Sequence, residues 1–187
     1  MTKTRNATDV ARRCLCLELL AQRSLLESDE EEPLAGREAA RAQWSSRIAD
    51  LGVADTLSSE ERALLDAPVG ALSEDERDDL DGRSAGAAVL LWALGRAPQR
   101  PTFALADDVI AEHGLLGDGS ISAARAAAEG ATLRAASELD AAIASYRRAR
   151  GKAKDPSDAE QIYAGIGAHH LEWIVDASMS FDDDLAT

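Results

Sequence analysis

Apolar residues recur every three or four positions through most of the chain, which is the spacing that places them on one face of a helix. The clearest stripe belongs to the last predicted helix, which begins at Ser157 and carries Ile162, Ile166 and Ile174 on one face. Other stripes predict helices over 8–26, 36–50, 107–113 and 133–151. The pattern therefore predicts an all-α fold.

Two more helices are indicated by their N-terminal signals. Ser58 is followed three residues later by Glu61, and Ser73 by Glu76, which is the spacing of a capping box. The segment 85–94 is rich in Ala and Leu and is followed by a glycine, which favours a buried helix over a buried strand. Together these elements predict a single compact domain over residues 1–187, an irregular bundle of about six to eight helices.

The charge of the chain limits the class of partner. The sequence has 34 acidic and 20 basic residues, a formal charge of -14, which repels nucleic acid. Such a charge can serve solubility alone or can present a face to a basic protein, and composition by itself favours solubility. A partner surface would draw on a predicted acidic loop, 27–33, and on the helix after Ser73. Its candidate residues are Asp29, Glu30, Glu31, Glu32, Glu74, Asp75, Asp78 and Asp79.

The chain is expected to remain in the cytoplasm. Its first ten residues are polar, and its longest apolar run, Ala85–Leu94, is half of the roughly 20 residues needed to insert across a bilayer. Cys14 and Cys16 point about 200° apart on a helix, so they are expected to be reduced and buried. The tail 178–187 either frays as a flexible end or is pinned by Phe181.

Several short segments, taken in order, resemble the bacterial domain-of-unknown-function 4272 family over about residues 6–187. The matching pieces are Ala11-Arg12-Arg13, the segment 57–62, LLWALG from Leu90 to Gly95, Leu133-Arg134, Leu171-Glu172-Trp173 and the acidic C-terminus. The chain departs from the family where Gly82 and Ala85 flank the retained Arg83, and where Ile166 and Gly167 replace a charged pair. The family has no assigned activity, so the resemblance implies a helical fold and a bacterial cytoplasmic setting and supplies no catalytic residue.

Candidate metal and catalytic chemistry is weak in this sequence. His169 and His170 point about 100° apart on a helix and cannot chelate one ion together, and His170 fits better as a hydrogen-bonded core residue. Glu112, His113 and His170 form the remaining alternative metal set. Gly165 and Gly167 lie within a helix, where they favour close approach of another helix over phosphate binding. No cofactor is therefore expected.

Arg83 is the polar residue best placed to take part in a site. It stands beside a buried helix, where a guanidinium needs a paired carboxylate or a bound anion, and the ion pair is the favoured interpretation. The sequence favours a non-enzymatic interaction protein, of inhibitor or immunity type, whose acidic face binds another protein. One alternative is an enzyme or small-ligand binder with a polar interhelical pocket around Arg83. Another is a structural subunit that uses Trp44 or Phe181 as an oligomer contact.

Overall fold

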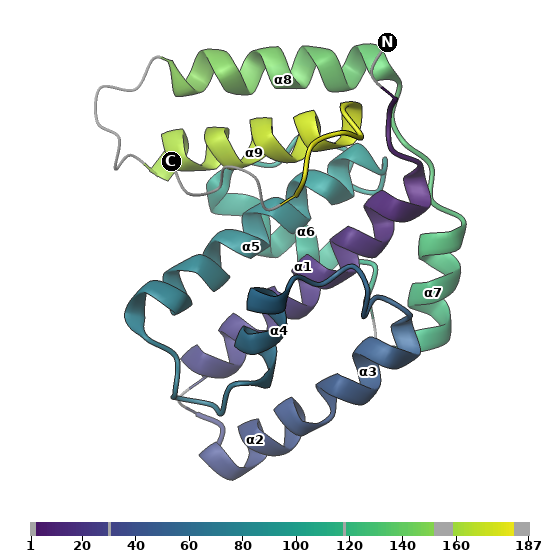
Figure 1. Cartoon of the computed structure of the whole chain (residues 1–187). Coiled ribbons are helices and arrows are strands. Elements are labelled where there is room, and N and C mark those ends of the chain that lie inside the picture. The colour runs from purple at the N-terminus through teal and green to yellow at the C-terminus, as the bar shows by residue number, and fades with distance from the viewer. Residues whose placement is uncertain (1–2, 30, 118, 152–158, 182–187) are drawn as a thin grey trace.

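A computed structural model describes residues 3–29, 31–117, 119–151 and 159–181 (Figure 1). These residues contain helices and no strand, so the predicted all-α fold is confirmed. The helices are α1 (Ala7–Ser28), α2 (Leu34–Ala42), α3 (Trp44–Leu51), α4 (Ser59–Asp66), α5 (Glu74–Ala93), a 3-10 turn η1 (Phe103–Leu105), α6 (Ala106–His113), α7 (Ile121–Glu129), α8 (Ala136–Arg150) and α9 (Ala159–Val175).

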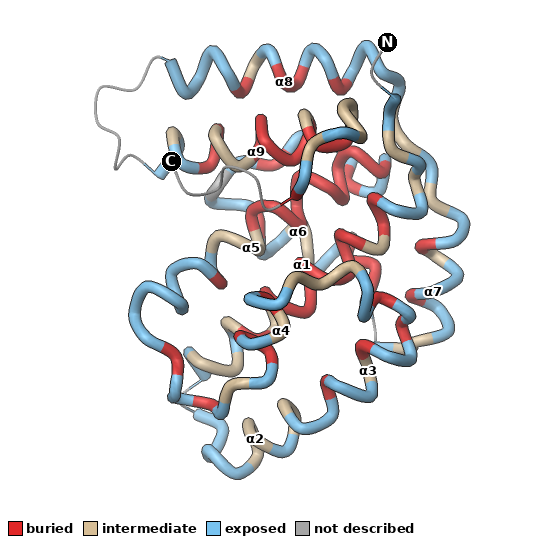
Figure 2. Tube along the Cα trace, in the orientation of Figure 1, coloured by how far each residue is buried: buried red, intermediate tan, exposed pale blue. Residues whose placement is uncertain are grey.

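Helices α1 and α5 form the centre of the molecule, and α9 packs on α5 with α8 outside it (Figure 1). Buried residues concentrate on α1, α5 and α9, whereas α2 has exposed and intermediate residues only and the outer side of α8 is exposed (Figure 2). Helix α1 begins where the Asn6 side chain accepts the N–H of Asp9 at 2.8 Å. Its apolar residues surround the helix rather than forming one stripe, and this explains its central place.

Helix α5 is acidic in its first half and apolar in its second half, and it continues through both without a break. Its start carries the predicted capping box, with Ser73 and Glu76 exchanging hydrogen bonds, and α4 has the same arrangement at Ser58 and Glu61. Carboxylates in the first turn of α5 also interact favourably with the helix dipole. Residues 85–93 are all buried, as the apolar run predicts.

Three predicted boundaries were wrong. The helix expected over 36–50 is two helices, α2 and α3, which meet at Gln43. Helix α1 continues to Ser28, so Glu27 belongs to that helix and not to the acidic loop. Helix α8 starts at Ala136 because the preceding Arg134 is bound to the end of α5: its backbone N–H donates to Ala93 O at 2.9 Å. The predicted starting residue of α9, Ser157, lies outside the described residues.

The two ends of the described chain are joined. The backbone N–H of Arg5 donates to Ile174 O at 2.9 Å, and that of Ala177 donates to Lys3 O at 2.8 Å. Phe181 is buried against α9, where its ring lies 5.1 Å from that of Trp173, so this residue of the predicted tail is pinned. Residues 182–187 lie outside the described residues. None of the described helices is long and apolar enough to cross a membrane.

Candidate functional site

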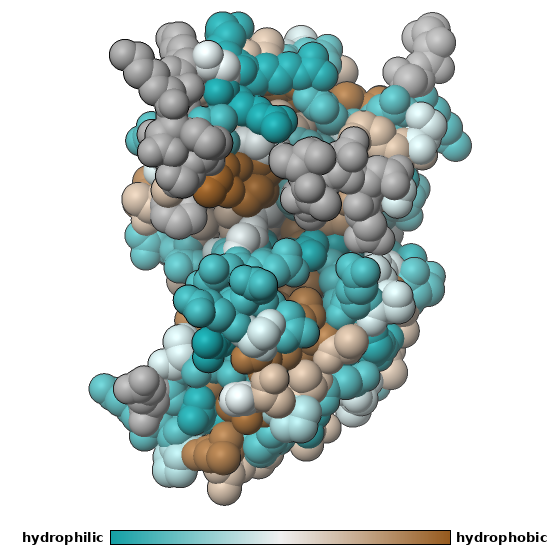
Figure 3. Space-filling view, turned by 60° about the vertical axis from the view of Figure 1, so that its left-hand side comes forward, coloured by the Kyte–Doolittle hydropathy of each residue, from teal (hydrophilic) through white to brown (hydrophobic). Residues whose placement is uncertain are grey.

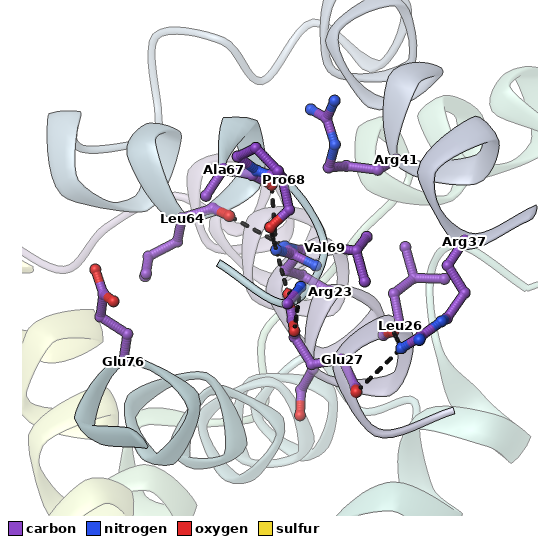
Figure 4. Close-up of polar contacts among 12 residues, drawn as sticks. Arg23, Leu26, Glu27, Arg37, Arg41, Leu64, Ala67, Pro68, Val69 and Glu76 are labelled. Atoms are coloured by element: carbon purple, nitrogen blue, oxygen red, sulfur yellow. Dashed lines mark hydrogen bonds and ion pairs between the residues drawn. The ribbon is translucent and has the colours of Figure 1, made fainter. Parts of the chain in front are cut away.

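One buried arginine, Arg23, holds the C-terminal end of α1 in place (Figure 4). The side chain of Arg23 is fully buried and forms an ion pair with Glu27 one turn later. Burial lowers the pKa of Arg23, and the neighbouring Glu27 carboxylate opposes that shift. The guanidinium also donates to three carbonyl oxygens that end α4 and follow it, those of Leu64 (3.1 Å), Ala67 (3.2 Å) and Pro68 (3.1 Å). The end of α1 is thereby fixed to the α4–α5 connection.

Helix α2 is attached to this region by charged side chains rather than by an apolar face. Arg37 donates to Leu26 O at 3.0 Å, Arg41 donates to Asp66 O at 3.0 Å, and Glu38 accepts the N–H of Val69 at 2.6 Å. None of the nine residues of α2 is buried. Helices in globular proteins are usually stabilised by burying an apolar face. Helix α2 therefore lies beside the end of α1 without a buried apolar face.

Leu25 forms a ridge between two grooves on this part of the surface, and 63% of it is exposed. One groove, of about 830 Å³, lies between α1, α2, α3 and α7, and we call it the α3 groove. The other, of about 650 Å³, lies between α1, α5, α6 and the 116–117 turn, and we call it the acidic groove. Gln22 and Leu25 line both grooves, so the two share one wall.

The floor of the acidic groove is built around Glu18. Its carboxylate is buried and accepts the backbone N–H groups of Leu115 and Leu116, each at 2.8 Å. Burial raises the pKa of Glu18, while the two N–H donors oppose the shift. Both oxygens are thus occupied in holding the loop that follows α6. The exposed carboxylates of the lining are Asp81 on α5 and Asp107 on α6, and none of the described residues that line this groove is Lys or Arg.

Part of the predicted partner surface adjoins the acidic groove. Its described members are all exposed: Asp29, Glu31, Glu32, Glu74, Asp75, Asp78 and Asp79, whereas Glu30 lies outside the described residues. Glu74 and Asp78 precede Asp81 by seven and three residues, so the three carboxylates share one face of α5. Asp29 follows Ser28, which lines the groove. Figure 3 shows a largely hydrophilic surface with separate apolar patches, one of them at the end of the molecule where α2 lies.

Arg83 takes part in an internal ion-pair cluster. Its guanidinium lies 3.3 Å from Glu61 and 2.9 Å from Asp79, so the ion pair that the sequence favoured is present. Glu61 is only 1% exposed and is also bound by both terminal nitrogens of Arg13, at 2.7 and 2.5 Å. The ring of Phe181 covers that guanidinium at 3.5 Å. Sequence reasoning missed Arg13 as a member of this cluster, because the contact joins residues far apart in the chain.

Two other sets of predicted residues are placed differently from expectation. The His113 ring lies 3.6 Å from the carboxylate of the adjacent Glu112, and no three His, Cys, Asp or Glu side chains gather as metal ligands among the described residues. Glu112, His113 and His170 therefore do not form the alternative metal set. Trp44 and Phe181, the suggested oligomer contacts, are both buried. Their large rings pack within the domain instead of facing outward.

His170 makes the stability of the domain sensitive to acid. Its Nδ1–H donates to Ile166 O at 2.8 Å, and burial lowers the pKa of the ring from 6.5 to about 3, with Arg13 and Arg83 adding to the effect. The unfolded chain therefore binds this proton at higher pH than the folded protein does, and stability falls as the pH falls from 6.5 towards 3. We expect the loss through His170 to be about 2 kcal/mol between pH 6.5 and pH 5.

Urea unfolding of the wild type and of His170→Asn at a series of pH values measures this contribution. Asparagine keeps a donor near the position of Nδ1 but does not titrate. The wild type should lose more stability than the variant as the pH falls from 6.5 to 5. Equal pH slopes for the two proteins would show that His170 does not carry the effect.

Residues 1–183 match the family model described as "Domain of unknown function (DUF4272)". No curated protein and no solved structure matches the chain. The matched region includes all the described helices and both grooves.

Proposed function

Since the chain belongs to the DUF4272 family, whose description names no activity, we propose from its geometry that it is a protein-interaction module that binds a basic segment of another protein in the acidic groove. The observation that carries this proposal is the composition of the groove: Asp81 and Asp107 face it, and its described lining has no basic side chain. Leu25 supplies an exposed apolar edge beside them.

The charge of the groove defines the partner that it fits. Asp81 and Asp107 come from different helices and share one hollow, so a Lys or Arg side chain placed between them would interact favourably with both. The acidic residues at the start of α5 extend the same negative surface. A formal charge of -14 over the chain steers basic partners towards the protein and repels polyanions. Binding should therefore weaken as salt screens these charges.

The alternative function, a ligand pocket around Arg83, has less support. Two carboxylates already contact the Arg83 guanidinium, and a bound anion would have to compete with both of them. A cation in the acidic groove would have no ion pair to displace among the described residues, because Asp81 and Asp107 form none there, although Asp81 accepts a hydrogen bond from the Ser24 hydroxyl. This difference is why we assign the interaction to the groove and the Arg83 cluster to stability.

Affinity capture from the native cell tests the proposal, with the tagged wild type compared with Asp81→Lys/Asp107→Lys at about 50 mM and about 500 mM salt. The matched control is Glu129→Lys/Asp140→Lys, which changes the net charge equally at exposed positions outside both grooves. A stoichiometric partner should be retained by the wild type and the control at low salt, and lost by the groove variant. If the groove variant, folded by circular dichroism, keeps the partner as well as the control does, the proposal is wrong.

A further inference from the structure

We infer that the partner segment is a basic amphipathic helix that lies across Leu25, with an apolar side chain in the α3 groove and a cationic side chain in the acidic groove. This inference rests on the proposed function and names the class of partner for that site. It follows from three features of the surface: the shared ridge, the different lining of the two grooves, and the unburied helix α2.

The shared ridge indicates one occupant for both grooves. Leu25 and Gln22 belong to both linings, so a side chain entering either groove covers the same residues. Two independent partners would compete for that ridge. A single segment can instead bury the exposed side chain of Leu25 beneath its middle and reach into the groove on each side.

The two grooves favour different side chains of a partner. Leu26, Ile121 and the largely buried Trp44 give the α3 groove an apolar lining, and its charged members, Arg47 and Asp50, are of opposite sign. That composition fits an apolar anchor. The acidic groove carries Asp81 and Asp107 with no basic residue in its described lining, which fits Lys or Arg. A partner that fills both must carry apolar side chains next to cationic ones, as an amphipathic helix does along the border between its two faces.

Helix α2 would gain apolar contacts from such a partner. It has no buried residue, and Ala40 and Ala42 line the α3 groove together with Leu26 of α1. An apolar side chain inserted there would cover apolar surface of α2 and give this helix the apolar contact that it lacks. About 25 cal/mol is gained for each Å² of apolar surface removed from water.

A helix suits this surface better than an extended strand. The described residues contain no strand, so they offer no sheet edge to which an extended peptide could add. A helix presents side chains three or four residues apart on one face, and can therefore place one on each side of a ridge. Recognition of an amphipathic helix in a groove between helices uses this spacing.

A designed peptide tests the inference without knowledge of the natural partner. The probe is a labelled peptide of about 18 residues, Leu and Lys in a helical amphipathic pattern, titrated by fluorescence anisotropy. The comparison peptides are oligolysine of equal charge and the same pattern with Glu in place of Lys. We expect the Leu/Lys peptide to bind the wild type at least 10-fold more tightly than either comparison peptide. A wild type that binds oligolysine equally well overturns the inference.

Two variants of α2 locate the apolar contact. Ala42 lines the α3 groove and is exposed, so Ala42→Trp fills the groove without disturbing the core. Ala39→Trp places the same ring at an exposed position of the same helix outside the groove lining, and serves as the control. We expect Ala42→Trp to weaken binding of the Leu/Lys peptide at least 10-fold and Ala39→Trp to leave it unchanged. Asp81→Lys/Asp107→Lys should also weaken it at least 10-fold.

The outcomes separate the inference from the proposed function. If the aspartate variant abolishes capture of the cellular partner while Ala42→Trp affects neither capture nor peptide binding, the acidic groove is the site and the inference of a second anchor is wrong. If the aspartate variant affects neither assay, both proposals fail. Loss of binding in both groove variants, with the Ala39→Trp control unaffected, supports both.

Discussion

Replacing Glu61 by alanine should destabilise the protein by about 3–5 kcal/mol, because it removes one partner of a buried ion pair. Arg13, which is 2% exposed, would lose its two hydrogen bonds to a carboxylate and keep the 3.4 Å one to Thr56 O, and Arg83 would lose one of its two carboxylates. An unpaired buried guanidinium cannot shed its charge by losing a proton. Most domains are stable by only about 5–15 kcal/mol, so this single change would remove much of the total.

The second capping box of the chain provides the matched control. Glu61 also accepts the N–H of Ser58 at the start of α4, and Glu76 does the same for Ser73 at the start of α5, where it is exposed. Glu76→Ala therefore removes only a cap and should cost about 1 kcal/mol. Urea unfolding of the two variants measures the difference. Equal losses would show that the Arg13–Glu61 pair contributes nothing beyond the cap.

A double variant distinguishes the contribution of the ion pair from the cost of leaving one buried charge without its partner. Arg13→Met/Glu61→Leu replaces both charges by apolar side chains of similar length, and such replacements of buried ion pairs are often neutral or stabilising. We expect the double variant to be more stable than Glu61→Ala. The remaining cost should come from the lost cap at Ser58 and from the contact that Arg83 makes with Glu61.

The two capping boxes also show which parts of the structure the sequence could predict. A Ser followed three residues later by Glu is a local signal, and both helix starts were predicted from it. The sequence does not distinguish Glu61 from Glu76, because what buries Glu61 is Arg13, 48 residues away in the chain. Contacts over such distances follow from the packing of α1 against α4, which hydrophobic periodicity does not define.

The candidate site depends on the same kind of long-range contact. Leu25 belongs to an apolar series in α1, and nothing in that pattern separates it from Leu19 and Leu20, which are fully buried. It is exposed because α2 is attached by Arg37, Arg41 and Glu38 and leaves the α3 groove open. The acidic composition was read from the sequence, whereas the meeting of Asp107 and Asp81 in one groove was not predicted.

Two glycines of α9, Gly165 and Gly167, were both predicted to allow close approach of another helix. The structure separates them. A Cβ on Gly167 would lie 2.6 Å from Cζ of the Tyr146 ring, while a Cβ on Gly165 would meet nothing within 4 Å. Gly167→Ala forces two packed helices apart and should destabilise the protein by about 2–3 kcal/mol. Gly165→Ala should stabilise it by about 0.5–1 kcal/mol, because alanine is the better helix former.

Urea unfolding of the two alanine variants, two residues apart in one helix, isolates the steric effect from helix propensity. Tyr146→Leu should relieve the clash, so Gly167→Ala should cost less in that background than in the wild type, a coupling that a double-mutant cycle measures. If Gly167→Ala is as stable as Gly165→Ala, the α8–α9 contact is looser than the structure places it. If the cost of Gly167→Ala persists with Tyr146→Leu, the clash is not with that ring. A cost that appears only when Tyr146 is present identifies close approach of α8 as the reason for glycine at position 167.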